Sequence, residues 1–488
     1  MLSSLEQTRL KVSGRTEAAK KSRLGQFLTP ASTASFMAGL FPEARGKCRL
    51  LDAGAGIGSL SSAFLDRCVA GNLNFESIRL KAFEIDDSIH GELRQSLSAY
   101  LNSARFSFEI FGNDFIEEAV NAIQFQKFDF THVILNPPYK KIGSNSRYRL
   151  LLRQVGIETV NLYSAFVALA VALAAPGGQI VAIIPRSFCN GPYYRPFRDF
   201  ILESAAIRHL HLFESRSQAF RDDDVLQENI IIRLERGGRQ GPVAVSTSAD
   251  DSFGDLVAHE YPFDRIVFPE DTERFIHVPT SPEGDAAGSC RLCRYSLAEL
   301  GIQVSTGPVV DFRLKEHLRD MPDAGTVPLL YPVHFKDGSI AWPMLGMKKP
   351  NAILRNVETE KWLYPSGYYC AVRRFSSKEE MRRIVASVVD PATLGGAPVL
   401  GFENHLNLFH DNKRGLPQAL AHGLALFLNT TPVDEQFRRF SGHTQVNATD
   451  LKTMKYPSRA VLAELGEWAM GQAKLTQAMM DAKLGGIA

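Results

Sequence analysis

Short hydrophobic runs alternate with helical patterns through the first half of the chain. The strand-like runs cover residues 49–52, 78–83, 106–111, 131–135, 179–184 and 229–234. Segments between them, such as residues 60–65, have the apolar spacing of helices. Strands that alternate with helices predict a mostly parallel sheet with right-handed crossovers. In such sheets ligands bind beyond the carboxyl ends of the strands.

The pattern changes after Arg236. The stretch GGRQGP at residues 237–242 is typical of a linker. Beyond it the apolar runs are short and irregular, with many Pro and Gly breaks, and the last segment, residues 458–483, has helical spacing. We therefore predict an α/β domain over residues 1–236 and a mixed α+β domain over residues 243–488 that ends in a helix.

Composition and charge place few limits on function. The 488 residues are 45% hydrophobic and 22% charged, and the net charge of +2 requires any DNA-binding surface to come from local Lys and Arg clusters. The longest apolar stretch, residues 165–175, is too short to cross a membrane, and no signal peptide is visible, so we expect a cytoplasmic protein. Cys290 and Cys293 have metal-like spacing, but nothing nearby completes a tetrahedral set, so we expect no metal.

Small and acidic residues follow three successive strand-like runs. The stretch DAGAGIG at residues 52–58 opens a helix, and its small residues let a ligand approach the backbone closely. Glu84 follows the second run, where a carboxylate can accept from both ribose hydroxyls, as it also does in dinucleotide-binding enzymes. Asp114 and Phe115 follow the third run, where an acid can accept from an adenine amine and a ring can pack on the base. The three strand ends together favour an adenosine-containing ligand.

The most specific motif is Asn136-Pro137-Pro138-Tyr139, which directly follows a buried strand. The two prolines stop that strand and leave the Pro137 carbonyl free to point into the cleft. This carbonyl and the Asn136 side-chain oxygen can accept the two N–H bonds of a planar amine. The nitrogen would then become tetrahedral and attack a sulfonium methyl group, so that catalysis rests on positioning and electrostatic preorganisation. Tyr139 offers a ring for stacking on a base.

An adenine amine in duplex DNA is paired and stacked, so the base must flip out to reach this motif. Basic residues that follow the motif can contact phosphates at the mouth of the cleft, and a solvated basic loop explains them equally well. They are Lys140, Lys141, Arg147, Arg149 and Arg153.

The motifs of residues 25–236, and their order along the chain, resemble those of the γ-class N6-adenine DNA methyltransferases. The first of them is GQFLTP at residues 25–30, which we call the leading motif. The resemblance implies a Rossmann-like class I methyltransferase fold, S-adenosylmethionine as methyl donor, and a C-terminal target-recognition domain. It implies cofactor contacts from Thr29, Asp52, Ala53, Gly54, Gly56, Glu84, Asp114, Phe115, Asn136 and Pro138, with Thr29 at the methionine end. It implies catalytic roles for Asn136, Pro137, Tyr139 and Phe220, and Phe220 would stack on the flipped adenine.

The second half resembles the recognition domain of PstI/BsuBI-like type II modification enzymes at residues 305–312 and 441–447. The expected partner is double-stranded DNA. About two dozen residues precede the leading motif, too few for a fused nuclease. We therefore expect that its restriction endonuclease, if it has one, is a separate chain. We also expect the protein to be a monomer. Side chains able to bind base edges or phosphates belong to His334, Lys336, Lys348, Lys349, Asn404, His405, His443, Gln445 and Asn447.

Three alternatives stay open. A methyltransferase acting on a protein glutamine would hold an amide in the same motif, and an RNA-adenine methyltransferase would hold a base of RNA. A DNA-recognition subunit would keep the fold without catalysis. The large second half and Phe220 favour DNA over protein, and the intact motif at Asn136 argues against a non-catalytic subunit.

Overall fold

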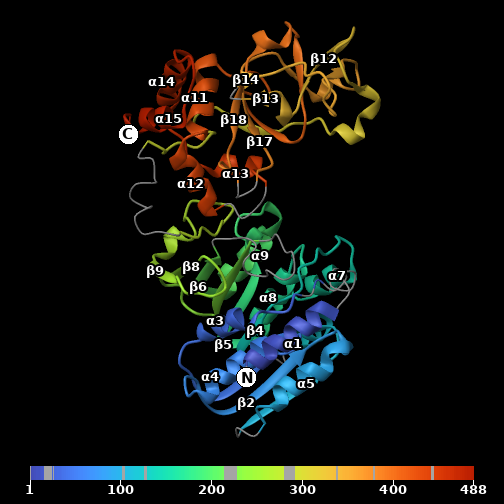
Figure 1. The fold of residues 1–488 in the computed structure, drawn as a ribbon, viewed down its shortest axis with the longest axis vertical. Helices are drawn as coiled ribbons and strands as arrows, with labels where there is room; N and C mark the ends of the chain where they lie inside the picture. Colours follow the sequence, from blue (N-terminus) through green and yellow to red (C-terminus); the bar gives the residue numbers. More distant parts are fainter. Residues whose placement is uncertain are drawn as a thin grey trace. The chain divides into compact units, whose positions relative to one another are not determined.

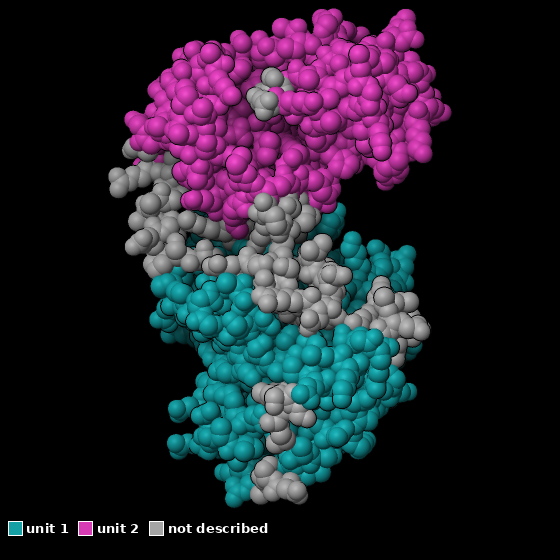
Figure 2. Space-filling view, viewed as in Figure 1, with its two compact units in different colours: residues 1–282 teal, residues 283–488 magenta. Residues whose placement is uncertain are grey.

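The computed structural model describes residues 2–15, 25, 27–101, 105–125, 129–213, 228–279, 292–336, 339–376, 380–440 and 445–487. The chain forms two compact units, residues 1–282 and 283–488 (Figure 2). Within the described ranges, every helix is too short or too polar to pass through a lipid bilayer.

Unit 1 contains the strands and helices drawn from blue to yellow-green in Figure 1. It is built on a nine-stranded sheet with the order β3-β2-β1-β4-β5-β7-β6-β8-β9. The neighbours from β3 to β5 pair in parallel, and β7 runs antiparallel to both β5 and β6. The predicted mostly parallel sheet is therefore confirmed. The strands are β1 (Arg45–Ala53), β2 (Asn74–Phe83), β3 (Phe106–Phe111), β4 (Phe130–Leu135), β5 (Ala174–Pro185), β6 (Ala205–Phe213), β7 (Asn229–Arg236), β8 (Val243–Ser248) and β9 (Val257–Tyr261).

Successive side chains of the central strands enter two different hydrophobic cores. Leu50 packs with α3 and α4, whereas Leu51 packs with α6 and α8, and Ile134 and Val133 divide in the same way. This follows from the alternation of side chains along a strand, and it puts helices on both faces of the sheet. The helices of unit 1 are α1 (Leu2–Arg15), α3 (Ala31–Gly39), α4 (Ser59–Val69), α5 (His90–Ser98), α6 (Phe115–Gln124), α7 (Arg147–Gln154), α8 (Leu162–Leu173) and α9 (Arg195–Ser204).

The sheet continues beyond the boundary predicted at residues 236–243. The stretch 237–242 is a turn that leads from β7 into β8, and β8 pairs in parallel with β6. β9 then pairs with β8, so the unit extends to Pro282 instead of ending at Arg236. Gly and Pro interrupt a strand, but they carry no information about which sheet the next strand joins.

Unit 2 combines sheets and helices, as predicted for a mixed α+β domain. It has a four-stranded sheet (β10-β20-β17-β18), a five-stranded sheet (β11-β15-β12-β19-β16) and the pair β13-β14. The strands are β10 (Gln303–Thr306), β11 (Leu318–Arg319), β12 (Thr326–Leu330), β13 (Phe335–Lys336), β14 (Ser339–Ile340), β15 (Ala352–Leu354), β16 (Leu363–Pro365), β17 (Tyr369–Arg373), β18 (Ala386–Val389), β19 (Val399–Phe402) and β20 (Leu406–His410).

The helices of unit 2 gather around a close helix crossing. A Cβ added at Gly423 of α11 would lie 1.7 Å from the carbonyl oxygen of Leu462 in α14, and one at Gly466 would lie 1.7 Å from that of Ala419. The predicted C-terminal helix is divided into α14 and α15 at residues 471–476. The helices are α11 (Gln418–Leu428), α12 (Thr431–Phe440), α13 (Ala448–Thr453), α14 (Arg459–Met470) and α15 (Gln477–Gly485).

Candidate active site

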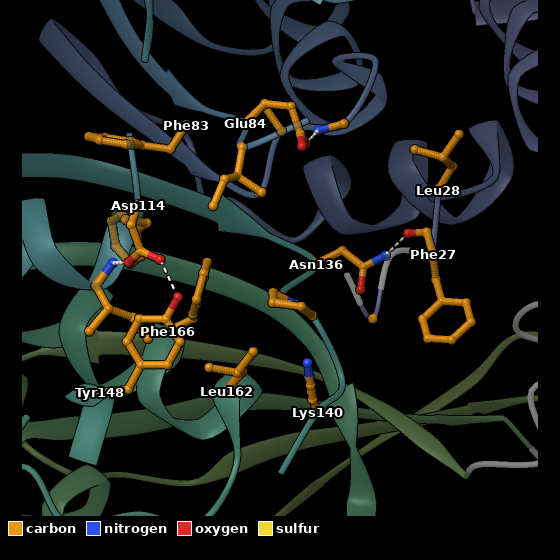
Figure 3. Close-up of a pocket in the computed structure, with 18 of the residues that line it drawn as sticks. Phe27, Leu28, Phe83, Glu84, Asp114, Asn136, Lys140, Tyr148, Leu162 and Phe166 are labelled. Carbon is orange, nitrogen blue, oxygen red and sulfur yellow. Dashed lines mark hydrogen bonds between the residues drawn. The ribbon is translucent and has the colours of Figure 1, made fainter. Parts of the chain in front are cut away.

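A cavity of about 350 Å³ lies at the carboxyl ends of β1 to β4 in unit 1 (Figure 3). Because these strands are parallel neighbours, the residues that follow them meet at one edge of the sheet. The leading motif, residues 140–148 and two residues of α8, Leu162 and Phe166, supply most of the remaining lining. Of the residues expected to contact a cofactor, those in the lining are Thr29, Gly54, Gly56, Glu84, Asp114, Phe115, Asn136 and Pro138.

The side-chain amide of Asn136 is held in one orientation. Its Nδ2 donates to the backbone carbonyl of Phe27 over 2.8 Å and to Thr29 Oγ1 over 3.0 Å (Figure 3). A carbonyl oxygen can only accept, so the amide nitrogen must face Phe27. The other amide atom, Oδ1, is buried and has no hydrogen-bond partner among the described residues. Asn136, a residue of the cavity lining, therefore keeps an unused acceptor.

Glu84 is buried beside the glycine turn that follows β1. Its Oε2 accepts from the backbone N–H of Gly56 over 2.7 Å, and its Oε1 accepts from that of Asp86 over 2.8 Å. Burial raises the pKa of this carboxyl group, and the two backbone hydrogen bonds act in the opposite direction. Each oxygen keeps a further lone pair, so Glu84 can still accept from ligand hydroxyls.

Asp114 caps α6 at one end of the cavity. Its Oδ1 accepts from the backbone N–H groups of Ile116 and Glu117 over 2.9 and 3.3 Å, and its Oδ2 accepts from the hydroxyl of Tyr148. Phe115 follows the cap and packs on Phe83 and Phe166, with ring centroids 5.3 and 4.9 Å away. These three rings line the cavity and form an apolar wall beside the carboxylate.

Asp52 lies in the core instead of in the cavity lining. It is completely buried, and its Oδ2 accepts from the hydroxyl of Ser61 over 2.6 Å. Burial raises the pKa of Asp52 to about 7, and the nearby Glu84 adds to this effect, whereas the Ser61 hydrogen bond opposes it. The described contacts thus link Asp52 to the start of α4, and the adjacent Ala53 is also buried outside the lining.

Pro137 and Tyr139 stand outside the cavity lining. Pro137 is buried, and the half-buried ring of Tyr139 lies 5.6 Å from that of Phe27 and 6.2 Å from that of Tyr163. The Tyr139 hydroxyl donates to the carbonyl of Ile183 over 3.3 Å. Phe220, the fourth residue expected to be catalytic, lies outside the described residues, so its placement next to these residues stays a prediction.

The basic residues after the catalytic motif have different surroundings. Arg147 pairs with Glu117 over 2.9 Å, and both Arg149 and Arg153 pair with Glu158. By contrast, Lys140 and Lys141 contribute to the cavity lining. The three arginines therefore form ion pairs between α7 and nearby glutamates. Among the basic residues that follow the motif, the two lysines are the ones that line the cavity.

The residues of unit 2 that were expected to contact DNA bases or phosphates differ in burial and in their contacts. His334 is completely buried between the backbone N–H of Tyr331 and the side-chain oxygen of Asn351, so its ring has a structural role. His405 is 44% exposed, and its Nδ1 contacts the carboxylate of the completely buried Glu403. Lys336, Lys348 and Lys349 are exposed; Asn404, Gln445 and Asn447 are partly buried; and His443 lies outside the described residues.

Tyr148 and Ile85 are among the cavity residues that the sequence-based prediction did not include. Tyr148 reaches the cavity from α7, and Ile85 presents a side chain that is 53% exposed although it is apolar. Ile85 gave no usable signal in the sequence, because single exposed apolar side chains are common on protein surfaces. Nothing in the sequence indicates that the Tyr148 side chain lies next to Asp114.

Comparisons with known proteins find relatives that cover most of the chain. Residues 47–220 match the family model described as Eco57I restriction-modification methylase. The chain is 54% identical to type II methyltransferase M.BsuBI of Bacillus subtilis over 95% of this chain and 94% of that protein. It is 42% identical to type II methyltransferase M.PstI of Providencia stuartii, with 91% and 89% covered. Among solved structures, the cryo-EM structure of a DrdV–DNA complex aligns with a TM-score of 0.49 at 12% identity, over 95% of this chain and 58% of that one.

The sheet, with its cavity at the ends of the parallel strands, defines a class I methyltransferase fold. Because two relatives above 40% identity are covered almost completely, the chain belongs to the type II methyltransferases of restriction-modification systems.

Proposed function

We propose that the protein transfers a methyl group from S-adenosylmethionine to N6 of an adenine flipped out of double-stranded DNA. The observation that carries this proposal is the fixed amide of Asn136. With Nδ2 committed to Phe27 and Thr29, the unpartnered Oδ1 can accept one N–H bond of the target amine. The carbonyl of Pro137 is proposed to accept the other.

This arrangement suits a neutral, weakly nucleophilic amine. Two acceptors draw the nitrogen toward a tetrahedral geometry and stabilise the positive charge that develops on it. The amine becomes acidic as it is methylated, so its proton can pass to water, and no strongly basic side chain is required. Asn136 cannot take up a proton at neutral pH, so its contribution is orientation and electrostatic stabilisation.

The cavity residues fit S-adenosylmethionine. Gly56 has φ +56°, and a Cβ there would come within 2.9 Å of Leu28 Cδ2. Glycine at this position therefore keeps the cavity wall open, so that a ligand can approach the backbone closely. Glu84 would hold the ribose hydroxyls, Asp114 the adenine amine, and Phe115 the adenine face. When bound, the cofactor supplies an electrophilic methyl group on sulfur.

Unit 2 is proposed to read the DNA sequence. His405 is the best-organised candidate, because the buried Glu403 accepts from its backbone N–H over 2.9 Å and contacts its Nδ1. This contact fixes the ring and leaves Nε2 available for a base edge or phosphate. We also propose that the protein acts as a monomer in the cytoplasm, and that any cognate restriction endonuclease is a separate chain.

The proposal is tested by incubating the full chain with S-adenosylmethionine and unmethylated plasmid DNA, followed by single-molecule sequencing. We expect N6-methyladenine at one short recurring sequence. Parallel reactions offer RNA and a protein extract with labelled cofactor. Label in RNA or protein, with none in DNA, would contradict the proposal and favour one of the alternative substrates.

A further inference from the structure

Tyr148 closes one end of the cavity and holds the carboxylate of Asp114. Its hydroxyl donates to Asp114 Oδ2 over 2.5 Å (Figure 3). The other carboxylate oxygen is taken up by the backbone N–H groups of Ile116 and Glu117 at the start of α6. Both oxygens of Asp114 are therefore oriented by the chain itself, one by the helix cap and one by the phenol.

The position of Tyr148 is built into the packing of α7 on α6. Next to it, Arg147 pairs with Glu117 over 2.9 Å. At the far end of the two helices, Gln124 Nε2 donates to Gln154 Oε1 over 3.1 Å. The tyrosine is thus placed by contacts on both sides of it, and its half-buried ring lines the cavity.

We propose that Tyr148 is a positioning residue of the cofactor site, whose hydroxyl shares Asp114 Oδ2 with the exocyclic amine of the cofactor's adenine. The inference rests on the proposed function, because it takes S-adenosylmethionine as the ligand. A carboxylate oxygen can accept two hydrogen bonds, so the phenol occupies one lone pair and steers the other toward the cavity. Burial and the nearby Asp114 raise the pKa of Tyr148 to about 12, so the hydroxyl remains a donor at neutral pH.

This arrangement makes the site selective for a 6-amino purine. An amine donates to the oriented Oδ2, whereas a carbonyl at the same position would bring its lone pairs against a carboxylate. Without the phenol, Asp114 Oδ2 would lose its fixed orientation. The preference for adenine over hypoxanthine should then shrink.

The test is isothermal titration calorimetry of the full chain with S-adenosylhomocysteine and with S-inosylhomocysteine, which carries a carbonyl in place of the amine. Tyr148→Phe is expected to weaken S-adenosylhomocysteine binding about five- to tenfold, the effect of one hydrogen bond, and to change S-inosylhomocysteine binding less than about twofold. The matched control is Tyr193→Phe at a residue that is 76% exposed and outside the cavity lining, which should leave both affinities unchanged.

Two results would overturn the inference while the wild type still binds S-adenosylhomocysteine. One is an unchanged affinity in Tyr148→Phe, and the other is an equal loss for both ligands, which would indicate a packing role alone. A wild-type protein that binds neither ligand would instead contradict the proposed function. Thermal unfolding of each variant verifies that the two tyrosine substitutions leave the fold intact.

Discussion

Asn136 Nδ2 donates to the backbone carbonyl of Phe27 across 2.8 Å, although the two residues are 109 positions apart in the sequence. The leading motif therefore sets the orientation of the Asn136 amide, in addition to lining the cavity. Thr29 completes this arrangement by accepting from the same nitrogen. The consequence is that substitutions in the leading motif should affect turnover through Asn136.

Thr29→Val removes the hydroxyl that Asn136 uses and keeps the shape of the side chain. We expect turnover to fall about threefold to tenfold, the effect of one hydrogen bond, because Asn136 keeps only the Phe27 carbonyl as a partner. Thr29→Ser retains the hydroxyl and should stay near the wild-type rate. Single-turnover methylation at saturating cofactor separates this effect from cofactor binding. Equal rates for the Val and Ser variants would show that Thr29 does not orient the amide.

Gly56→Ala should weaken cofactor binding. The added Cβ would lie 2.9 Å from Leu28 Cδ2 in the cavity wall, at a residue with φ +56°. Gly71→Ala is the matched control, since Gly71 has φ +77° and nothing lies within 4 Å of its added Cβ. Both variants carry similar backbone strain, so a loss of S-adenosylhomocysteine affinity in Gly56→Ala alone identifies the close approach as the cause. Similar affinities in the two variants would show that the close contact between position 56 and Leu28 does not affect cofactor binding.

Asp52 should make the stability of unit 1 depend on pH. Its pKa is about 7 in the folded protein against an ordinary value of 3.8, so the folded state holds a proton that the unfolded chain releases. Stability contributed by this proton is lost as the pH rises from about 4 to about 7. Asp52→Asn has no such proton, and its oxygen can still accept from Ser61. Urea unfolding at pH 5 and pH 8 should find the variant gaining on the wild type by at most about 3 kcal/mol. A difference that stays constant between the two pH values would contradict this.

Gly466→Ala should destabilise unit 2. Its Cβ would lie 1.7 Å from the carbonyl oxygen of Ala419, so α11 and α14 would have to separate, at a cost of about 3 kcal/mol. Gly485→Ala near the end of α15 meets nothing within 4 Å and should be close to neutral. Thermal unfolding monitored by circular dichroism compares the two. Identical transitions would mean that the crossing tolerates a methyl group.

The sequence predicts strands well where apolar residues run continuously or alternate regularly with polar ones. The run at residues 106–111 coincides with β3, whereas β1 begins earlier than predicted because Arg45 and Lys47 at its start are exposed and polar. β6 was missed altogether. Its His211 is buried, with Ser246 Oγ 2.9 Å from the ring nitrogen. A buried polar pair of this kind interrupts the pattern of apolar residues by which a strand is predicted.

The residues of the candidate site also divide into those that the sequence predicts and those that it does not. Glu84, Asp114 and Asn136 were predictable, because residues at the ends of parallel strands converge on one edge whatever the loops do. The direction of the Asp52 carboxylate depends on Ser61, and a pattern of small residues cannot reveal it. Tyr148 reaches Asp114 only through the packing of α7 on α6, a tertiary contact without a sequence signature.

The most direct test of the central claim compares wild type and Asn136→Ala with methyl-labelled S-adenosylmethionine and duplex DNA. The products are digested to nucleosides and identified by mass spectrometry, and S-adenosylhomocysteine binding is measured on both proteins. The account predicts labelled N6-methyldeoxyadenosine from the wild type and at least about a hundredfold less from Asn136→Ala, with cofactor affinity largely kept. Label on a cytosine, or a full methylation rate without the Asn136 amide, would contradict it.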